Sequence, residues 1–176
     1  MYEVELRSFI TKEKYDELLL FFNEKGQFLS EDQQTTYYFE SPVDLRLQQN
    51  KAHCKLIVKK GAIHDAVKEE FEVSFAHDDF KPLCELLLAL GYKVSVQWLR
   101  KRLAFRWEDV LVMLDDTKGY GLVLELEKQC GTGEKDQVLE LLAAKLGFLG
   151  VTLTSTHEFD QKFAEYKKNW KELLNF

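Results

Sequence analysis

The stretch EVELR, residues 3–7, places two carboxylates and a guanidinium on alternate positions of what should be the first strand. Successive side chains of a strand point to opposite faces. Val4 and Leu6 therefore share an apolar face, and the opposite face carries Glu3, Glu5 and Arg7. The same division into an apolar and an ionic face recurs in nearly every strand that the sequence predicts, so the charged face needs an explanation.

Segments with two different spacings of apolar residues alternate along the chain, one typical of strands and one typical of helices. Period-two alternation predicts eight strands, over residues 2–9, 35–40, 44–49, 53–60, 68–75, 94–107, 110–116 and 121–128. The segment FRWEDVLVML (105–114) is typical of a hairpin that turns at residues 108 and 109. Helical periodicity with capping residues predicts four helices, over residues 11–25, 78–90, 134–146 and 160–174. We therefore predict an α+β fold with a mostly antiparallel sheet of eight strands.

Length and composition limit the domain organisation and the classes of partner. The 176 residues suffice for one domain with a substantial core. The sequence has only 2 prolines and no repeat of fixed period, so no segment is typical of a linker between domains. We expect a single domain over residues 1–176. The net charge of -6 argues against a general binder of nucleic acid or anionic membranes, which would carry a basic excess.

The three cysteines are scattered and lack the spacing of metal ligands: Cys54, Cys84 and Cys130. We interpret them as small core residues of a protein in a reducing compartment. No apolar run approaches the length of a membrane span. We therefore expect a cytoplasmic protein without nucleic-acid or membrane partners, and a homodimer is left open.

On the ionic faces, charges of one sign gather on the same strand. The acid pairs are Glu3/Glu5, Glu70/Glu72 and Glu125/Glu127, and the basic sets are Arg46, Lys55/Lys59 and Arg100/Arg102. Like charges two apart on one face lie about 6.6 Å apart, which is unfavourable unless something lies between them. Paired carboxylates suit a divalent cation, and paired cationic groups suit phosphate oxygens. A half-solvated sheet remains the alternative, because a chain this rich in glutamate forms Glu-x-Glu pairs by chance.

Seven segments in order resemble motifs of the CYTH superfamily. These triphosphate tunnel metalloenzymes include class IV adenylate cyclases, thiamine triphosphatases and inorganic tripolyphosphatases. EVELR is similar to the family's opening Glu-x-Glu-x-Lys. The other similar segments are QTTYYFE (34–40), DLRLQ (44–48), LIVKKG (56–61), KEEFEV (68–73), RKR (100–102) and MLDDTKGYGLVLELE (113–127).

This resemblance implies an eight-stranded antiparallel β-barrel, a tunnel, with flanking helices. It implies that Mg²⁺ or Mn²⁺ is bound by Glu3, Glu5, Asp115, Glu125 and Glu127. Glu70 and Glu72 are either further ligands or structural partners of the basic residues. A triphosphate-containing small molecule would be bound by Arg7, Arg46, Lys55, Lys59, Arg100 and Arg102. The catalytic residues would be Glu5, Arg7 and Lys59.

The chain departs from the family pattern at three places. Arg7 stands where the family usually has lysine, Gln48 replaces a second arginine, and a threonine at 35 or 36 stands where an aspartate is often found. We expect a metal-dependent triphosphatase acting on inorganic tripolyphosphate or on a nucleoside or organic triphosphate. An adenylate cyclase that makes cyclic AMP and pyrophosphate from ATP stays open, as does a non-catalytic module that binds polyphosphate or nucleotide.

Overall fold

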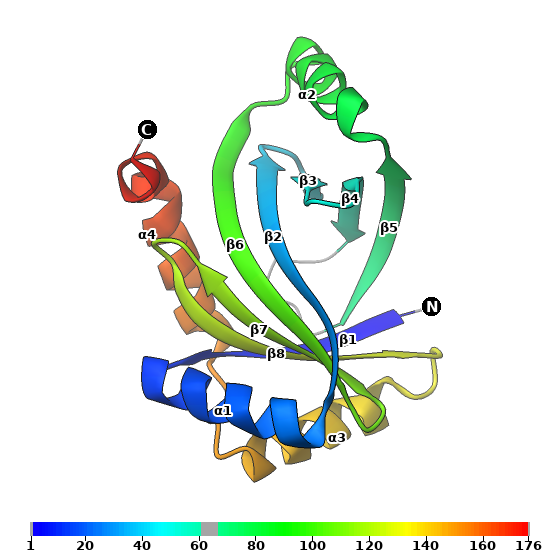
Figure 1. Cartoon of the computed structure of the whole chain (residues 1–176). Helices are drawn as coiled ribbons and strands as arrows, with labels where there is room; N and C mark the ends of the chain where they lie inside the picture. The colour runs from blue at the N-terminus through cyan, green and yellow to red at the C-terminus, as the bar shows by residue number, and fades with distance from the viewer. Residues whose placement is uncertain (1, 61–66, 176) are drawn as a thin grey trace.

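The computed structural model describes residues 2–60 and 67–175 of the chain (Figure 1). Its strands are β1 (Tyr2–Ile10), β2 (Gln27–Phe39), β3 (Asp44–Gln49), β4 (Cys54–Lys60), β5 (Val67–Phe75), β6 (Val94–Trp107), β7 (Val110–Thr117) and β8 (Gly121–Cys130). Its helices are α1 (Lys12–Lys25), α2 (Phe80–Ala89), α3 (Lys135–Phe148) and α4 (Thr156–Leu174), with a short 3-10 helix, η1 (His77–Asp79), before α2. The predicted α+β fold is confirmed.

All eight strands pair antiparallel in the closed order β1-β5-β4-β3-β2-β6-β7-β8. The ring closes between β1 and β5, where Glu3 pairs with Lys68 and Val4 with Val67 among the described residues. Toward its C-terminal end β5 rises away from β1 (Figure 1). We call this closing ladder the β1–β5 seam.

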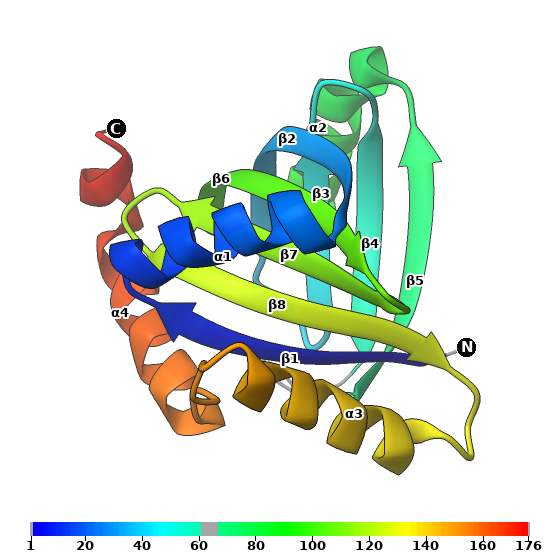
Figure 2. The ribbon, with the colours of Figure 1, turned by 60° about the horizontal axis from the view of Figure 1, so that its bottom comes forward.

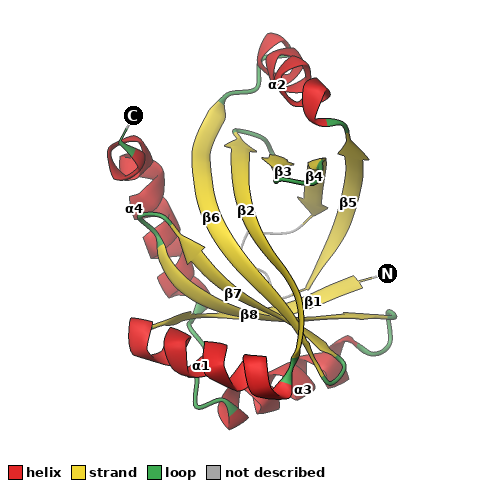
Figure 3. Ribbon diagram, in the orientation of Figure 1, coloured by secondary structure: helices red, strands yellow, loops and turns green. Residues whose placement is uncertain are grey.

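Helices cover the outside of the ring (Figure 3). α1 and α3 lie on one side, against β1, β6, β7 and β8 (Figure 2). Phe22 and Leu142 are fully buried there between the helices and the apolar strand faces. α1 begins where predicted, because the Thr11 side chain accepts a hydrogen bond from the Lys14 backbone N–H at 3.2 Å. A second core forms where α2 brings Phe80 and Leu87 against β3 and β4.

α4 packs against one end of the barrel interior. An aromatic cluster forms there from Tyr38, Trp98, Tyr120 and Tyr166, with Phe9, Phe163 and Trp170 packed against it. The Tyr166 hydroxyl donates to the Gln97 carbonyl at 3.1 Å and lies 3.3 Å from the Lys118 carbonyl. This hydroxyl fastens α4 across β6 and the β7–β8 turn, so the helix closes this end of the barrel.

The largest departure from the predicted elements is β2, which begins at Gln27 rather than at residue 35. The added segment QFLSEDQQ is polar and lacks period-two alternation. It extends because the 14-residue β6 offers it a partner, with Gln27 opposite Arg106. The predicted hairpin at residues 108 and 109 is confirmed, with Trp107 paired to Val110.

The three cysteines are free thiols, with Cys54 and Cys130 buried. None of the helices in the described ranges combines the length and apolar character that a membrane crossing requires.

Candidate functional site

The ionic faces of the strands point into the barrel. Residues paired across an antiparallel ladder share a face. Glu5 pairs with Glu127, and Arg7 with Glu125. Together with their neighbours they line an interior cavity of about 400 Å³. The alternative of a solvated ionic face is excluded, because the Glu3, Arg46 and Glu125 side chains are only 13%, 12% and 8% exposed.

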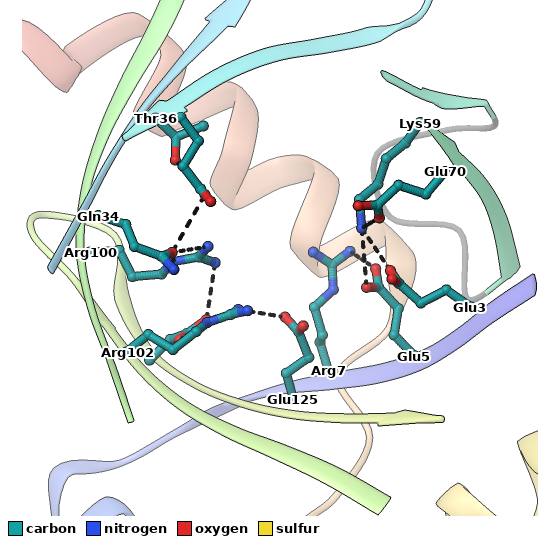
Figure 4. A network of polar contacts seen from close by, with 12 residues as sticks. Glu3, Glu5, Arg7, Gln34, Thr36, Lys59, Glu70, Arg100, Arg102 and Glu125 are labelled. Carbon is teal, nitrogen blue, oxygen red and sulfur yellow. Dashed lines mark hydrogen bonds and ion pairs between the residues drawn. The ribbon is translucent and has the colours of Figure 1, made fainter. Parts of the chain in front are cut away.

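The first part of this cavity is an acidic wall, which we define as Glu3 and Glu5 on β1 with Glu125 and Glu127 on β8. Lys59 reaches this wall from β4. Its Nζ lies 2.7 Å from both Glu3 Oε1 and Glu70 Oε2, and 4.0 Å from Glu5 Oε2 (Figure 4). Lys59 thus bridges β1 and β5 across the seam. It lies among the carboxylates of the acidic wall and not beside the arginines.

Burial and crowding perturb the protonation of this wall. Burial raises the pKa of Glu127 to about 8, and repulsion from Glu3 and Glu125 adds to the shift. Burial also raises the pKa of Glu3 to about 7, although Lys59 attracts its charged form. Burial would lower the pKa of Lys59, but the surrounding carboxylates, Glu5 foremost, raise it above its ordinary value. Near neutral pH, burial and crowding thus favour the protonated forms of Glu3 and Glu127, which lowers the negative charge of the wall.

The second part of the cavity is a basic wall built around Arg100 and Arg102 on β6. Arg102 binds Asp115 through two nitrogens, at 2.7 and 2.6 Å, and Arg100 Nη1 lies 3.1 Å from the same carboxylate. Burial would raise the pKa of Asp115, but Arg100 and Arg102 hold it below its ordinary value. Asp115 is thus a shared anion that holds two guanidinium groups side by side.

Sequence reasoning missed the residues that orient these arginines. Gln34 Oε1 accepts hydrogen bonds from Arg100 Nε at 3.0 Å and Nη2 at 2.6 Å. Gln34 lies one residue before the predicted strand at 35–40 and shares a strand face with Thr36 and Tyr38. Its position two before Thr36 is the signal that could have identified it.

Arg46 is held by a second missed residue, Asp44. Asp44 Oδ1 lies 2.8 Å from Arg46 Nε, and the guanidinium stacks over the Tyr38 ring at 4.7 Å. Asp44 is buried, and its position two before Arg46 on one strand face is the signal that could have identified it.

The departures from the family pattern lie in the same cavity. Arg7 Nη2 is 3.6 Å from Glu5, and its guanidinium lies 5.4 Å from the centre of the Phe159 ring on α4. Gln48 Nε2 donates to the Thr36 hydroxyl at 3.0 Å. A neutral amide donor therefore takes the place of the missing second arginine. Lys55 also lines the cavity, where it pairs with Glu72 at 2.9 Å.

The residues of the acidic wall fit a divalent metal by their chemistry. They are hard oxygen donors, and the raised pKa of Glu127, caused by burial and by its acidic neighbours, shows repulsion that a cation would relieve. No group of three or more His, Cys, Asp or Glu side chains in residues 2–60 and 67–175 is already arranged as a metal site.

Comparisons with known proteins agree with this architecture. The CYTH domain family model matches residues 1–164. A Methanocaldococcus jannaschii protein named "Putative adenylate cyclase MJ0240" is 30% identical over 115 residues. That match covers 64% of this chain and 65% of the relative, just under two thirds of the relative's length.

Solved structures show the same fold. The PH1819 protein of Pyrococcus horikoshii matches with a TM-score of 0.74 at 23% identity, over 91% of this chain and 98% of that one. A Hippeastrum protein, described as a "putative adenylyl cyclase" that "reveals a dominant" triphosphatase activity, matches with a TM-score of 0.63 at 19% identity, over 89% and 93%. Because the family model spans nearly the whole sequence, the chain belongs to the CYTH domain family.

Proposed function

We propose that this protein is a metal-dependent triphosphate hydrolase acting on inorganic tripolyphosphate or on a nucleoside or organic triphosphate. The observation that carries this proposal is the interior cavity, in which guanidinium groups face carboxylates across a space of about 400 Å³ (Figure 4). Members of the family bind triphosphates and generally depend on a divalent metal. The Hippeastrum structure is itself described as a triphosphatase, which supports hydrolysis over other reactions.

The cationic residues would hold the substrate. A guanidinium can bind two phosphate oxygens at once, and Asp44, Asp115 and Gln34 already fix the planes of the three arginines on β3 and β6. Prearranged donors stabilise the charge of a transferring phosphoryl group without reorganisation during the reaction. The proposed binding set is Arg7, Arg46, Lys55, Lys59, Arg100 and Arg102.

The acidic wall would hold the cation. Glu3, Glu5, Glu125 and Glu127 supply the oxygen donors, and a role for Asp115 stays a prediction because the arginines occupy its carboxylate. A bound Mg²⁺ or Mn²⁺ supplies Lewis-acid polarisation of a phosphoryl oxygen. Arg7 on β1 and Lys59 on β4 both lie beside Glu5, and there they would neutralise charge on the departing phosphate.

An adenylate cyclase is the second candidate, favoured by the name of the Methanocaldococcus relative. Cyclisation uses the ribose 3′-hydroxyl as nucleophile in place of water and releases pyrophosphate. Both reactions use the same cavity, so only their products separate them. A binding module without catalysis is the remaining outcome.

One assay separates these candidates. The protein is incubated with tripolyphosphate, ATP or thiamine triphosphate, each with Mg²⁺ or Mn²⁺, and orthophosphate, pyrophosphate and cyclic AMP are measured. We expect orthophosphate, its loss in Glu5→Gln, and its retention in Glu24→Gln, which changes an exposed glutamate on α1. Cyclic AMP with pyrophosphate would identify a cyclase, and tight triphosphate binding without product would identify a binding module.

A further inference from the structure

The second half of β5 has an open edge. Residues 71–75 pair with β4, and no other strand among the described residues pairs with them. In Figures 1 and 2 this half of β5 lies at the rim of the molecule, with β4 on one side and no element of the described chain on the other. An open edge presents a row of backbone N–H and C=O groups on which a further strand can pair.

The outer face of the same segment is apolar and exposed. Phe71 and Val73 are 48% and 63% exposed. Val58 and Leu56 of β4 lie beside them in the ladder, and both pack against the core that α2 covers. Phe75 packs against the same core. An apolar surface therefore continues from the α2 core out to the open edge.

The segment lacks the features by which proteins usually block an open edge. Residues 71–75, FEVSF, contain no lysine and no proline, and their ladder with β4 has no bulge. Their single charged residue, Glu72, faces the cavity and pairs with Lys55 at 2.9 Å. Neither backbone geometry nor an unpaired charge therefore prevents another strand from docking.

We propose that two copies of this chain associate through this edge, with their β5 strands antiparallel about a two-fold axis. Charge selects the register. With Glu72 on the axis, two carboxylates would lie directly opposite each other, which is unfavourable. With Val73 on the axis, Val73 meets Val73 of the second copy, Phe71 meets Phe75, and Glu72 meets Ser74. The segment is then complementary to itself, as an interface between identical subunits about a two-fold axis requires.

The interface would be small. A ladder of this length buries less surface than a permanent dimer does, so we expect association that depends on protein concentration. In dilute solution the monomer would prevail and leave the edge of β5 open. The second copy would steady β5, the strand whose Glu70 binds Lys59 at the β1–β5 seam. This inference does not depend on the proposed function.

The first test measures the molecular mass by sedimentation equilibrium over a range from about 5 to about 500 µM, across which a weak association becomes visible. We expect the wild type to pass from monomer toward dimer. Val73→Lys should stay monomeric, because it places two ammonium groups opposite each other on the axis. Leu20→Lys is the control, because Leu20 is 73% exposed on α1, and it should dimerise like the wild type.

Circular dichroism checks that both lysine variants are folded. A wild type that stays monomeric at every concentration would overturn the proposal and leave the edge to solvent or to a strand of another protein. A dimer that persists in Val73→Lys would also overturn it, because association would then use another surface.

The second test reads the register. In a Cys84→Ser background the remaining cysteines, Cys54 and Cys130, are buried. Val73→Cys would place two thiols opposite each other on the axis, at a separation that a disulfide accepts. With oxidised glutathione we expect it to form linked dimers at least about 10-fold faster than Leu20→Cys, because pairing raises the local thiol concentration. Equal rates of cross-linking in the two variants would overturn the proposed pairing.

Discussion

The densest contacts of the cavity converge on one residue, Asp115. Its side chain is 4% exposed and receives Arg100 and Arg102 together. Burial and the neighbouring Arg102 both lower the pKa of Arg100, so the pair of guanidinium groups depends on this carboxylate. Removing one partner from a buried charge network leaves the other charges uncompensated.

We therefore expect Asp115→Asn to lower the free energy of unfolding by about 3 kcal/mol. The matched control is Asp116→Asn, which changes the next residue of β7, where the side chain faces outward and is exposed. Urea unfolding of both variants at neutral pH measures the difference. Equal stabilities would show that solvent or Glu125 compensates the two arginines, against our interpretation.

The acidic wall makes a prediction about pH. Burial and neighbouring charge raise the pKa of Glu127 from 4.5 to about 8, so the folded state binds this proton more tightly than the unfolded chain does. That contribution is fully present below pH 4.5 and is lost as the pH rises through about 8. Each such group changes the unfolding free energy by at most about 1.4 kcal/mol per pH unit.

Metal-free protein should therefore lose stability between pH 5 and pH 9 more steeply than Glu127→Gln, which cannot ionise there. Thermal unfolding in the presence of a chelator, at a series of pH values, measures both slopes. Added Mg²⁺ should reduce the wild-type slope, because a cation stabilises the ionised wall. Parallel pH profiles of wild type and variant would contradict the raised pKa of Glu127.

At the level of secondary-structure elements, most of the architecture follows from the sequence. Seven of the eight strands begin and end within two residues of the predicted bounds, because their alternation is regular and turn residues flank them. β2 is the exception, since its first half is specified by pairing with β6 and not by its own side chains. α4 begins at Thr156 rather than at residue 160. Ser155 caps this start, because its hydroxyl accepts a hydrogen bond from the Glu158 backbone N–H.

The Tyr166 hydroxyl ties α4 to β6 in addition to the aromatic packing of the helix. Tyr166→Phe removes the hydrogen bond to the Gln97 carbonyl and should lower the unfolding free energy by about 1 kcal/mol. Hydrogen exchange should become faster along α4 and remain unchanged in α1. Tyr15→Phe is the control, because Tyr15 belongs to the α1 core. Uniform exchange in both variants would mean that aromatic packing alone holds α4.

For the molecule as a whole, the ring of strands closes at the β1–β5 seam. Among the described residues, β8 is paired on both sides, with β1 and β7, whereas residues 71–75 of β5 are paired with β4 alone. Lys59 strengthens the seam by bridging Glu3 on one strand and Glu70 on the other. Local opening requires less free energy where few backbone hydrogen bonds must break.

We expect the amides of β5 beyond the seam to exchange with solvent faster than those of β8 in native-state hydrogen exchange. Lys59→Met should widen this difference, because it removes the bridge and leaves two partly buried carboxylates without this cation. Lys60→Met is the control, since Lys60 pairs with Glu69 on the exposed side of the same strands. Equal exchange in β5 and β8 would contradict the expectation that one-sided pairing loosens this part of β5.

The sequence by itself determined the elements apart from the first half of β2, the division of the strands into apolar and ionic faces, and the charged residues that line the cavity. These follow from alternation, which is a local property of the chain. Only the tertiary structure decided which charges meet: Lys59 lies among the glutamates, Asp115 lies beneath the arginines, and α4 closes one end over Trp98 and Tyr120. The reason is physical, because pairings between distant strands depend on register and ring closure, and no local pattern encodes these.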